Sequence, residues 1–310
     1  MSSDPPHETV RAGGRSVRIN RPGKVLFPDD GLTKADLAAY YREAAGRMLP
    51  QLRGRPLMLE RHPGGIQDHG FMQKDTPEHT PEWVHRAELP KEGGTVTYTI
   101  CDDTATLVYL ADQACVTLHR FLSRADRADH PDRLVIDLDP PDGDFAPVRE
   151  AALRVRGLLA ELELPSTVMT TGSRGLHVLI ALDGKAHVDD VRAFARDAAD
   201  LLAARHPDTL TTQTRKDARR GRLYLDVQRN GYGQTSVAPY AVRSKPGAPI
   251  AAPVTWDDVA DPELTARRWT LTTAADLLKA DPWRGAPRGR SLGPARRRLD
   301  ALRKERGGRR

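Results

Sequence analysis

Two aspartates follow an apolar run in the middle of the chain, in the segment Leu134-Val-Ile-Asp-Leu-Asp-Pro-Pro. If that run is a β-strand, its period of two places Asp137 and Asp139 on the same face. Carboxylate oxygens are the donors that Mg²⁺ and Mn²⁺ prefer. The pair therefore predicts a divalent-cation site, although the same two residues could instead begin the solvated loop that follows.

A third aspartate stands in a second apolar run, Leu223-Tyr-Leu-Asp226. A strand and helix alternation allows this strand to lie beside the first, so that three carboxylates converge. Such a set can hold two cations about 3.5–4 Å apart, which is the arrangement used for nucleotidyl transfer. The alternative is that Asp226 is an exposed strand residue paired with a neighbouring arginine.

A glycine-rich turn, Thr170-Thr-Gly-Ser-Arg-Gly-Leu-His177, lies between these acids. Glycine lets backbone N–H groups approach an anion, hydroxyl groups donate hydrogen bonds, and arginine adds charge. The turn therefore predicts phosphate binding by Thr171, Ser173, Arg174 and His177. A glycine-rich hairpin with a core histidine would have the same sequence pattern.

A basic loop precedes the third acid, and a further cation, Arg243, follows it in Ala238-Pro-Tyr-Ala-Val-Arg243. The position of the loop next to Asp226 favours binding of a triphosphate or a nucleic-acid backbone, whereas a charge run elsewhere is usually a solvated face. Its cations are Arg215, Lys216, Arg219, Arg220 and Arg222.

Two features near the N-terminus could also contact nucleic acid. Lys24 and Lys34 flank the start of an expected helix, where free N–H groups favour a phosphate. Phe71 and Met72 lie in a segment beside Lys74 and could stack on bases, or could simply pack in the core.

The elements that position these residues follow from periodicity. Helices are expected from Thr33, as N-cap, to Pro50, from 104 to 121, over 147–164 and 188–206, and over 272–280. Strands are expected at 95–100, 134–139, 166–171, 176–182 and 222–228. The alternation after residue 134 predicts an α/β sheet with helices packed on it.

Composition narrows the class of protein. The 310 residues include 39% hydrophobic and 29% charged residues, with 25 Gly and 24 Pro, which excludes a helical bundle. Cys101 and Cys115 are too few for a disulfide framework, and no run is long enough to span a bilayer. A cytoplasmic protein with no membrane partner is expected.

The net charge of +6 is concentrated at the C-terminal end. Residues 288–310 carry +8, which leaves the rest of the chain at −2. We expect this tail to be disordered or only partly helical, and either to contact nucleic acid or to be merely solvated.

The motifs, taken in order, resemble the polymerase domain of bacterial ligase D, a member of the archaeo-eukaryotic primase superfamily. The resemblance runs from about residue 17 to 283 and adds Thr33-Lys34-Ala-Asp-Leu and Phe71-Met-Gln-Lys74 to the segments above. It implies a two-lobed primase-polymerase core of the α/β (α+β) class, with mixed central sheets flanked by helices. The expected parts are an N-terminal arm (1–22), a lobe for template and 5′-phosphate (23–133), a catalytic lobe (134–283) and the basic tail (284–310).

The resemblance also implies a function. It is template-directed addition of nucleoside triphosphates, ribonucleotides preferred, to DNA ends or gaps in non-homologous end joining. Cofactors would be Mn²⁺ or Mg²⁺, and partners would be DNA with a 5′-phosphate, Ku and a separate DNA ligase, in the bacterial cytoplasm at the nucleoid.

Residue roles carry over position by position. Asp137, Asp139 and Asp226 would be catalytic and metal-binding, Lys24 and Lys34 would bind the 5′-phosphate, and Phe71 and Met72 would stack on the template. Nucleotide binding would fall to His119, Thr171, Ser173, Arg174, His177, Lys216, Arg219 and Arg243.

Three departures from the family pattern limit this transfer. Met72 stands where a second Phe is frequent, Glu60 where a basic residue is common, and Thr171 where Ser is usual. Alternatives are a gap-filling or priming polymerase outside end joining, a non-catalytic DNA-end binding module, and a metal phosphoesterase. The last would hydrolyse substrate without a template.

Overall fold

The computed structural model describes residues 6–307 of the chain. Their contacts divide the chain into two compact units, each assembled from separate stretches of sequence. Unit 1 comprises Met1–Phe121, Val237–Ala252 and Arg267–Asp281, and unit 2 comprises Leu122–Ser236, Pro253–Ala266 and Pro282–Arg310. The expected catalytic lobe, 134–283, therefore contains two segments that the structure assigns to unit 1.

The N-terminal segment is a hairpin rather than the expected arm. Strands β1 (His7–Ala12) and β2 (Arg15–Asn20) pair antiparallel, and residues 1–5 lie outside the described part of the chain. The hairpin contacts helix α2 (Thr104–Asp112) and buries Val17 and Ile19. Their alternation with polar neighbours is a strand pattern that the surrounding Gly and charged residues obscured.

Helix α1 (Lys34–Leu52) begins where the sequence predicted and ends later. Thr33 is its N-cap, and a capping box joins Thr33 to Asp36. Pro50 lies within the last turn instead of ending the helix. Because a proline there removes a single hydrogen bond close to the C-terminus, the helix continues to Leu52.

The helix expected over 104–121 is wrong in its second half. Helix α2 (Thr104–Asp112) stops, Ala114 takes the left-handed conformation at φ 54°, and β9 (Cys115–Phe121) follows. Both α2 and β9 are largely buried, so apolar residues lie on all sides of each element. In such a sequence, the pattern of apolar residues does not distinguish a buried helix from a buried strand.

The other elements of unit 1 form small sheets. A four-stranded sheet has the order β15-β9-β5-β6, with β5 (Leu57–Arg61) and β6 (Phe71–Gln73), and β15 (Thr235–Val237) enters the unit at its last residue. Two-stranded pairs are β3 (Val25–Phe27) with β4 (Leu32–Thr33), and β7 (Arg86–Lys91) with β8 (Gly94–Thr99). The chain returns to this unit in η3 (Leu271–Thr273) and α7 (Ala274–Ala280).

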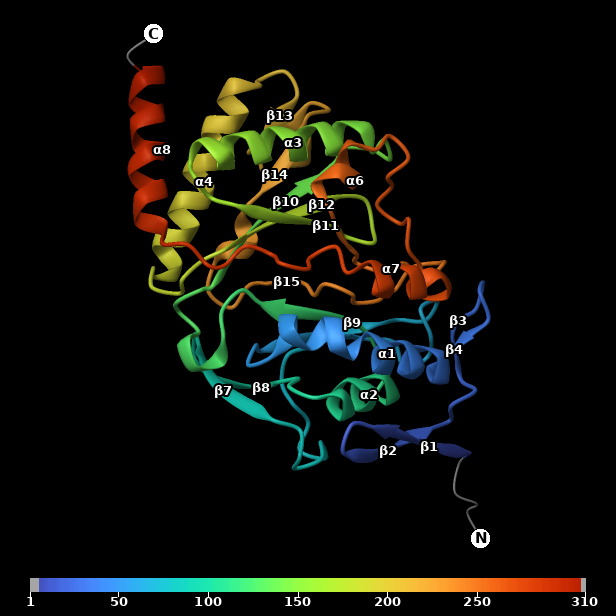
Figure 1. Cartoon of the computed structure of the whole chain (residues 1–310). Coiled ribbons are helices and arrows are strands. Elements are labelled where there is room, and N and C mark those ends of the chain that lie inside the picture. Colours follow the sequence, from blue (N-terminus) through green and yellow to red (C-terminus); the bar gives the residue numbers. More distant parts are fainter. Residues whose placement is uncertain (1–5, 308–310) are drawn as a thin grey trace. The chain divides into compact units, whose positions relative to one another are not determined.

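Unit 2 is built on a six-stranded sheet, which confirms the mixed α/β class (Figure 1). The strand order is β13-β14-β10-β12-β11-β16, and only β13 pairs parallel to its neighbour within this described sheet. The strands are β10 (Arg133–Asp139), β11 (Ser166–Thr170), β12 (Leu176–Ala181), β13 (Leu210–Thr211), β14 (Leu223–Asp226) and β16 (Pro253–Val254).

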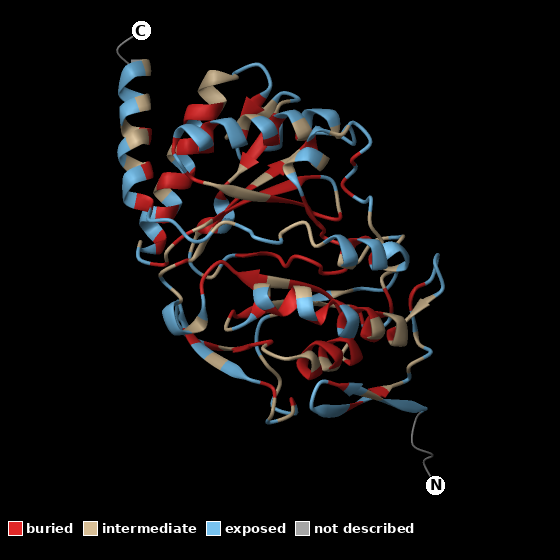
Figure 2. Cartoon of the chain, viewed as in Figure 1, coloured by how far each residue is buried: buried red, intermediate tan, exposed pale blue. Residues whose placement is uncertain are grey.

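Two long helices cover one face of this sheet. Helices α3 (Ala146–Glu161) and α4 (Val188–Arg205) contact each other and both contact β10. Along β10, Leu134, Ile136 and Leu138 are buried, whereas Asp137 and Asp139 on the alternate face are half-buried. Figure 2 shows these strands mainly in the buried colour, with the outer sides of the helices exposed. The acids therefore lie on the face that the helices leave open.

The basic tail is not disordered over its described length. Helix α8 (Leu292–Gly307) lies alongside α4, as Figure 1 shows, and residues 308–310 are outside the described part. Leu292, Ala295 and Leu299 are buried at helical spacing. Asp197 on α4 also pairs with Arg296 at 2.6 Å and with Arg303 at 2.9 Å. A few apolar residues and these ion pairs thus order a segment whose composition alone suggested disorder.

The remaining helices are short. They are η1 (Ala125–Arg127), α5 (Lys216–Arg219), η2 (Gln228–Asn230) and α6 (Trp256–Ala260), all in unit 2. No helix within residues 6–307 combines the length and the apolar character required to cross a bilayer.

Candidate active site

The three aspartates lie on one face of the sheet of unit 2. Asp137 and Asp139 are on β10, and Asp226 ends β14 directly opposite Asp137 in the antiparallel register. Residues opposite each other in an antiparallel pair share a face, and so do residues two apart on one strand. The structure therefore brings these carboxylates to a common face, and Asp226 does not point away from the other two.

The charges of this face repel one another. Burial raises the pKa of Asp226, and the negative charge of Asp137 raises it as well, while the hydrogen bond from the backbone N–H of Gln228, at 2.8 Å, acts in the opposite direction. Two carboxylates that disfavour each other's ionised form gain stability when a cation lies between them. Their hard oxygen donors fit Mg²⁺ or Mn²⁺.

Asp139 is held by two arginines. Arg174 Nη2 donates to Asp139 Oδ1 at 3.0 Å, and Arg219 Nη1 donates to Oδ2 at 3.1 Å. The Arg219 guanidinium also lies 4.0 Å from the centroid of the Tyr224 ring. Across residues 6–307, no group of three His, Cys, Asp or Glu side chains is arranged to hold a metal ion as it stands. A cation that used Asp139 would therefore have to displace these arginines.

His177 extends the acidic row onto a third strand. It lies opposite Asp137 across the β10–β12 pair, is buried, and places Nε2 3.5 Å from Asp137 Oδ1. It is a buried histidine, but its ring faces the acids and not only the apolar core. An imidazole in this place can hold the orientation of the Asp137 carboxylate.

The glycine-rich turn is fixed against the end of β10. The Thr171 hydroxyl accepts hydrogen bonds from the N–H groups of Ser173, at 3.3 Å, and Gly175, at 3.2 Å. A Cβ atom on Gly175 would lie only 2.1 Å from the carbonyl oxygen of Leu138. Glycine is required here because the turn approaches the backbone of β10 between the two aspartates. From this turn, Arg174 reaches Asp139.

The basic loop has two engaged cations, Arg219 and Arg222, and its other cations are exposed. Besides Asp139, Arg219 donates to the carbonyls of Gln213, at 3.2 Å, and Thr214, at 3.0 Å, which fixes the loop around it. Lys216 is exposed at the start of α5. Arg219 is therefore already at the acidic face, and Lys216 is free to reach an anion in solution.

A carboxylate in unit 1 collects several donors. His62 Nε2 lies 3.2 Å from Glu60 Oε1, His119 Nε2 lies 3.7 Å from Oε2, and the Ser244 hydroxyl donates to Oε1. Glu60 and His119 come together because β5 pairs with β9 in a register that puts Glu60 opposite Thr117. Their side chains consequently share one face of that sheet.

The donors control the charge of Glu60. Burial alone would raise its pKa, but hydrogen bonds from His119, Ser244 and His62 outweigh burial and hold the pKa well below its usual range. Sequence reasoning named Glu60 only as a departure and missed His62 and Ser244. The Glu60-x-His62 spacing was the available signal for His62, and nothing in the sequence pointed to Ser244.

Arg243 belongs to unit 1 and directly precedes Ser244 of the same cluster. Its backbone N–H donates to the carbonyl of Pro249 at 2.8 Å, next to the bridge between Val242 and Ile250. Its side chain is half-buried beside Ser244 in sequence. The predicted nucleotide ligands are thus divided, with His119 and Arg243 in unit 1 and the others in unit 2.

The two lysines predicted to bind a phosphate differ in their surroundings. Lys34 is buried, and its Nζ donates to the carbonyl of Asn20 at 2.7 Å and to Asp112 Oδ1 at 3.3 Å. Lys24 is half-buried, and its carbonyl accepts the backbone N–H of Lys34 at 2.8 Å. The backbones of the two residues are adjacent, but the Lys34 charge is already balanced by Asp112.

Phe71 and Met72 are not core residues. They lie on β6 and are 43% and 46% exposed, which favours a contact surface over core packing. The Arg61 guanidinium lies 5.5 Å from the centroid of the Phe71 ring. An exposed aromatic ring beside a cation is a suitable platform for a nucleobase.

Comparisons with known proteins identify the family of the chain. Residues 33–283 match the family model for the LigD primase-polymerase domain. The chain is 35% identical over 256 residues to the multifunctional non-homologous end joining protein LigD of Mycolicibacterium smegmatis, covering 82% of this chain and 34% of that protein. It is 29% identical over 258 residues to the bifunctional LigD of Bacillus subtilis, covering 83% of this chain and 41% of that protein. The chain thus spans about a third to two fifths of the length of these relatives.

A solved structure extends the match to three dimensions. The polymerase domain of Mycobacterium tuberculosis ligase D in complex with DNA superposes with a TM-score of 0.80 and 32% identity, over 91% of this chain and 97% of that one. The family model covers most of the chain, including every predicted site residue except Lys24. The chain therefore belongs to the LigD primase-polymerase domain family, a family of nucleotidyltransferases.

Proposed function

We propose that this protein is a template-directed polymerase that adds nucleotides to DNA ends or gaps during non-homologous end joining, by two-metal nucleotidyl transfer. The observation that carries the proposal is the row of His177, Asp137 and Asp226 across three adjacent strands. The family match supports the type of activity, and the DNA complex of the M. tuberculosis domain supports DNA as the substrate.

The chain's own residues have distinct tasks in this proposal. Asp137, Asp139 and Asp226 hold the cations, and His177 keeps Asp137 in position. Bound Mn²⁺ or Mg²⁺ would lower the pKa of the attacking hydroxyl and neutralise charge on the triphosphate. Arg174 and Arg219 release Asp139 and bind phosphate oxygens, a short movement because they already lie at that face.

In this proposal, the residues predicted from the resemblance bind the rest of the nucleotide and the DNA. The hydroxyls of Thr171 and Ser173 and the cations of Lys216 and Arg243 bind the triphosphate, and His119 lies near its ribose, where a preference for ribonucleotides would be set. Phe71 stacks on the template, and Met72 contributes less stacking than a second Phe would at that position. Lys24 is the more available ligand for a 5′-phosphate, since Lys34 is paired with Asp112. Ku and a separate DNA ligase complete the proposed pathway.

Extension of a primed template with Mn²⁺ and nucleoside triphosphates tests the catalytic assignment. Asp137→Ala and Asp226→Ala should abolish extension and leave DNA binding largely intact, because phosphate contacts, not these acids, give DNA affinity. Asp142→Ala, in the exposed loop after β10, is the matched control and should extend normally. Extension that survives Asp137→Ala, or template-independent hydrolysis by the wild type, would overturn the proposal.

A gapped duplex tests the finer assignments. We expect faster filling of a gap with a 5′-phosphate than of the same gap without one, and Lys24→Ala should lose that difference while Lys91→Ala, an exposed lysine of unit 1, keeps it. Comparison of ATP with dATP on this substrate measures the sugar preference, because the two differ only at the 2′ position. If the wild type fills the gap equally fast with and without the 5′-phosphate, the proposed phosphate site is wrong. If it incorporates the ribonucleotide and the deoxyribonucleotide equally well, the proposed ribonucleotide preference is wrong.

A further inference from the structure

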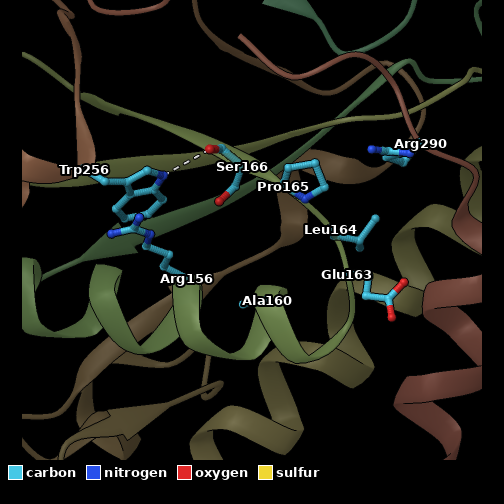
Figure 3. Close-up of a pocket in the computed structure, with 8 residues that line it drawn as sticks. All are labelled: Arg156, Ala160, Glu163, Leu164, Pro165, Ser166, Trp256 and Arg290. Carbon is cyan, nitrogen blue, oxygen red and sulfur yellow. Dashed lines mark hydrogen bonds between the residues drawn. The ribbon is translucent and has the colours of Figure 1, made fainter.

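A pocket of about 430 Å³ opens in unit 2 at the start of β11 (Figure 3). Its wall comes from the end of α3, the segment that leads into β11, the first residue of α6 and the segment before α8. The lining residues are Arg156, Ala160, Glu163, Leu164, Pro165, Ser166, Trp256 and Arg290. We call it the Trp256 pocket. Its volume lies within the range of about 300–1,000 Å³ that is usual for sites of small organic ligands.

The Trp256 pocket is separate from the acidic face. Ser166 begins β11, and Thr170 ends it at the glycine-rich turn. With a rise of about 3.3 Å per residue, the two ends of the strand are about 13 Å apart. A ligand in the pocket therefore does not occupy the place assigned to the triphosphate.

The aromatic wall of the pocket is fixed. Trp256 Nε1 donates to the carbonyl of Ser166 at 3.0 Å, which holds the ring at the start of β11. The Arg156 guanidinium lies 5.2 Å from the centroid of this ring, and Figure 3 shows it beside the indole. A planar cation and a planar ring held together in this way offer both charge and a stacking surface.

The opposite wall carries a second anchored cation. The backbone N–H of Arg290 donates to the carbonyl of Ala181 at 3.0 Å, and its carbonyl accepts from Asp183 at 3.1 Å. A Cβ on Gly289 would lie 2.2 Å from the carbonyl oxygen of Leu182, so this segment is pressed against the end of β12. The position of Arg290 is thus set by its backbone, and its side chain is left to face the pocket.

The charges of the pocket do not cancel. Glu163, its one carboxylate among the lining residues, is paired with Arg298 of α8 at 2.7 Å. In residues 6–307, no carboxylate pairs with Arg156 or Arg290. Arg156 lies beside the indole and Arg290 lies at the other end of the pocket, as Figure 3 shows. The pocket therefore offers two separate guanidinium groups, and guanidinium groups are well suited to bind phosphate oxygens.

We propose that the Trp256 pocket binds a nucleotide unit through its phosphate, at a site distinct from the catalytic face. Arg156, beside the indole, and Arg290, at the other end of the pocket, each offer a guanidinium group to phosphate oxygens, and the indole of Trp256 contacts the base or sugar. A free nucleotide and a unit of a single-stranded nucleic acid share this chemistry. The proposal depends on the side chains of unit 2 and not on polymerase activity.

Binding of two probes in EDTA tests the proposal, because without divalent cations the aspartates repel phosphate at the catalytic face. The probes are AMP, followed by calorimetry, and a fluorescent twelve-nucleotide oligothymidylate, followed by anisotropy. Arg290→Gln and Arg156→Gln should weaken binding of at least one probe about tenfold and lower its salt slope by about one. Arg288→Gln, exposed on the same segment but outside the pocket, is the matched control.

The outcomes separate the two sources of phosphate. Loss confined to AMP assigns the pocket to a free nucleotide, and loss confined to the oligonucleotide assigns it to a strand. Glutamine at 290 keeps the backbone hydrogen bonds of that segment, so the thermal midpoint should stay that of the wild type. Variants that bind both probes as tightly as Arg288→Gln would overturn the proposal, whatever the result of primer extension.

Discussion

Two carboxylates in this chain have opposite electrostatic surroundings. Asp226 is half-buried beside another acid, and both effects raise its pKa, whereas Glu60 is surrounded by donors that lower its pKa despite burial. The first arrangement is unfavourable until a cation arrives, which is typical of a functional site. The second is satisfied by the protein's own residues, so Glu60 contributes to folding and holds the ring of His119.

Replacing Glu60 with Gln should destabilise the protein at neutral pH. A carboxylate whose folded pKa is depressed adds stability above its unfolded pKa, for which the ordinary value is 4.5, and loses it as pH falls below that value. Allowing for solvent screening, we expect Glu60→Gln to cost about 1 kcal/mol at pH 7. Urea unfolding at pH 7 and pH 4 should show the difference between wild type and variant shrinking at the lower pH.

The control for this experiment is Glu43→Gln, an exposed carboxylate on α1. It should leave the free energy of unfolding almost unchanged at both pH values. A Glu60→Gln variant as stable as the wild type at pH 7 would mean that the donors around Glu60 do not favour its charge.

The positions of single site residues could be predicted where their spacing along one strand was enough to place them on the same face. The Asp137-x-Asp139 pattern fixes a common face as soon as a strand is assumed, and Asp226 needed only strand pairing. The Glu60 cluster was not predictable, because His119 and Ser244 reach it through strand pairing and loop contacts between distant parts of the sequence. Local propensity carries no information about such contacts.

At the scale of elements, the turn between β11 and β12 depends on its fit against β10. The Thr171 hydroxyl organises the turn, and Gly175 lets it approach the carbonyl of Leu138. Because Leu138 lies between Asp137 and Asp139, any displacement of this contact is transmitted to both aspartates.

Gly175→Ala should therefore impair both stability and nucleotide addition. Its Cβ would lie 2.1 Å from a backbone oxygen, so the turn or the end of β10 must move. Overpacking of this kind costs about 1–3 kcal/mol. Denaturant unfolding and primer extension measure the two effects, and Gly143→Ala, with no atom within 4 Å of its added Cβ, should change neither. Normal extension by Gly175→Ala would show that the aspartates do not depend on this contact.

Helix α8 shows how a basic segment becomes ordered. Its buried residues face α4, while Asp197 neutralises Arg296 and Arg303. Part of the tail's charge is thus paired with acids of the protein, and deletion of the tail would remove packing as well as charge. Composition predicted the charge correctly but could not reveal the acidic partner on α4.

Leu299→Ala should destabilise unit 2 although Leu299 lies in the basic tail. Its side chain is fully buried, and truncation of a buried leucine costs about 2–5 kcal/mol. Leu153→Ala on α3, where the leucine is 39% exposed, should cost much less. Thermal or urea unfolding compares the two, and equal stability of Leu299→Ala and the wild type would mean that α8 does not pack in solution.

At the scale of the whole molecule, the sequence order does not follow the compact units. The chain leaves unit 1 after Phe121 and returns to it at 237–252 and 267–281. Sequence reasoning placed one boundary near 133 because composition and periodicity change there. The return of the chain to unit 1 could not be predicted from the sequence, because a segment such as 237–252 has no periodicity that shows which hydrophobic core it joins.

These returns predict that residues 1–121 alone will not fold cooperatively. The Tyr40 hydroxyl donates to the carbonyl of Tyr240 at 2.7 Å, and Tyr41 donates to Val116 at 2.7 Å while accepting from Val242 at 3.3 Å. Without residues 237–252, the Tyr40 hydroxyl loses its acceptor, the Tyr41 hydroxyl loses the Val242 N–H but keeps Val116, and the apolar surface around them is uncovered. An unsatisfied buried group costs about 1–3 kcal/mol. Near-UV circular dichroism during heating should show no cooperative transition for the fragment, and linking residues 237–281 to it should restore one. A fragment that melts cooperatively without them would show that unit 1 is complete before the chain returns to it.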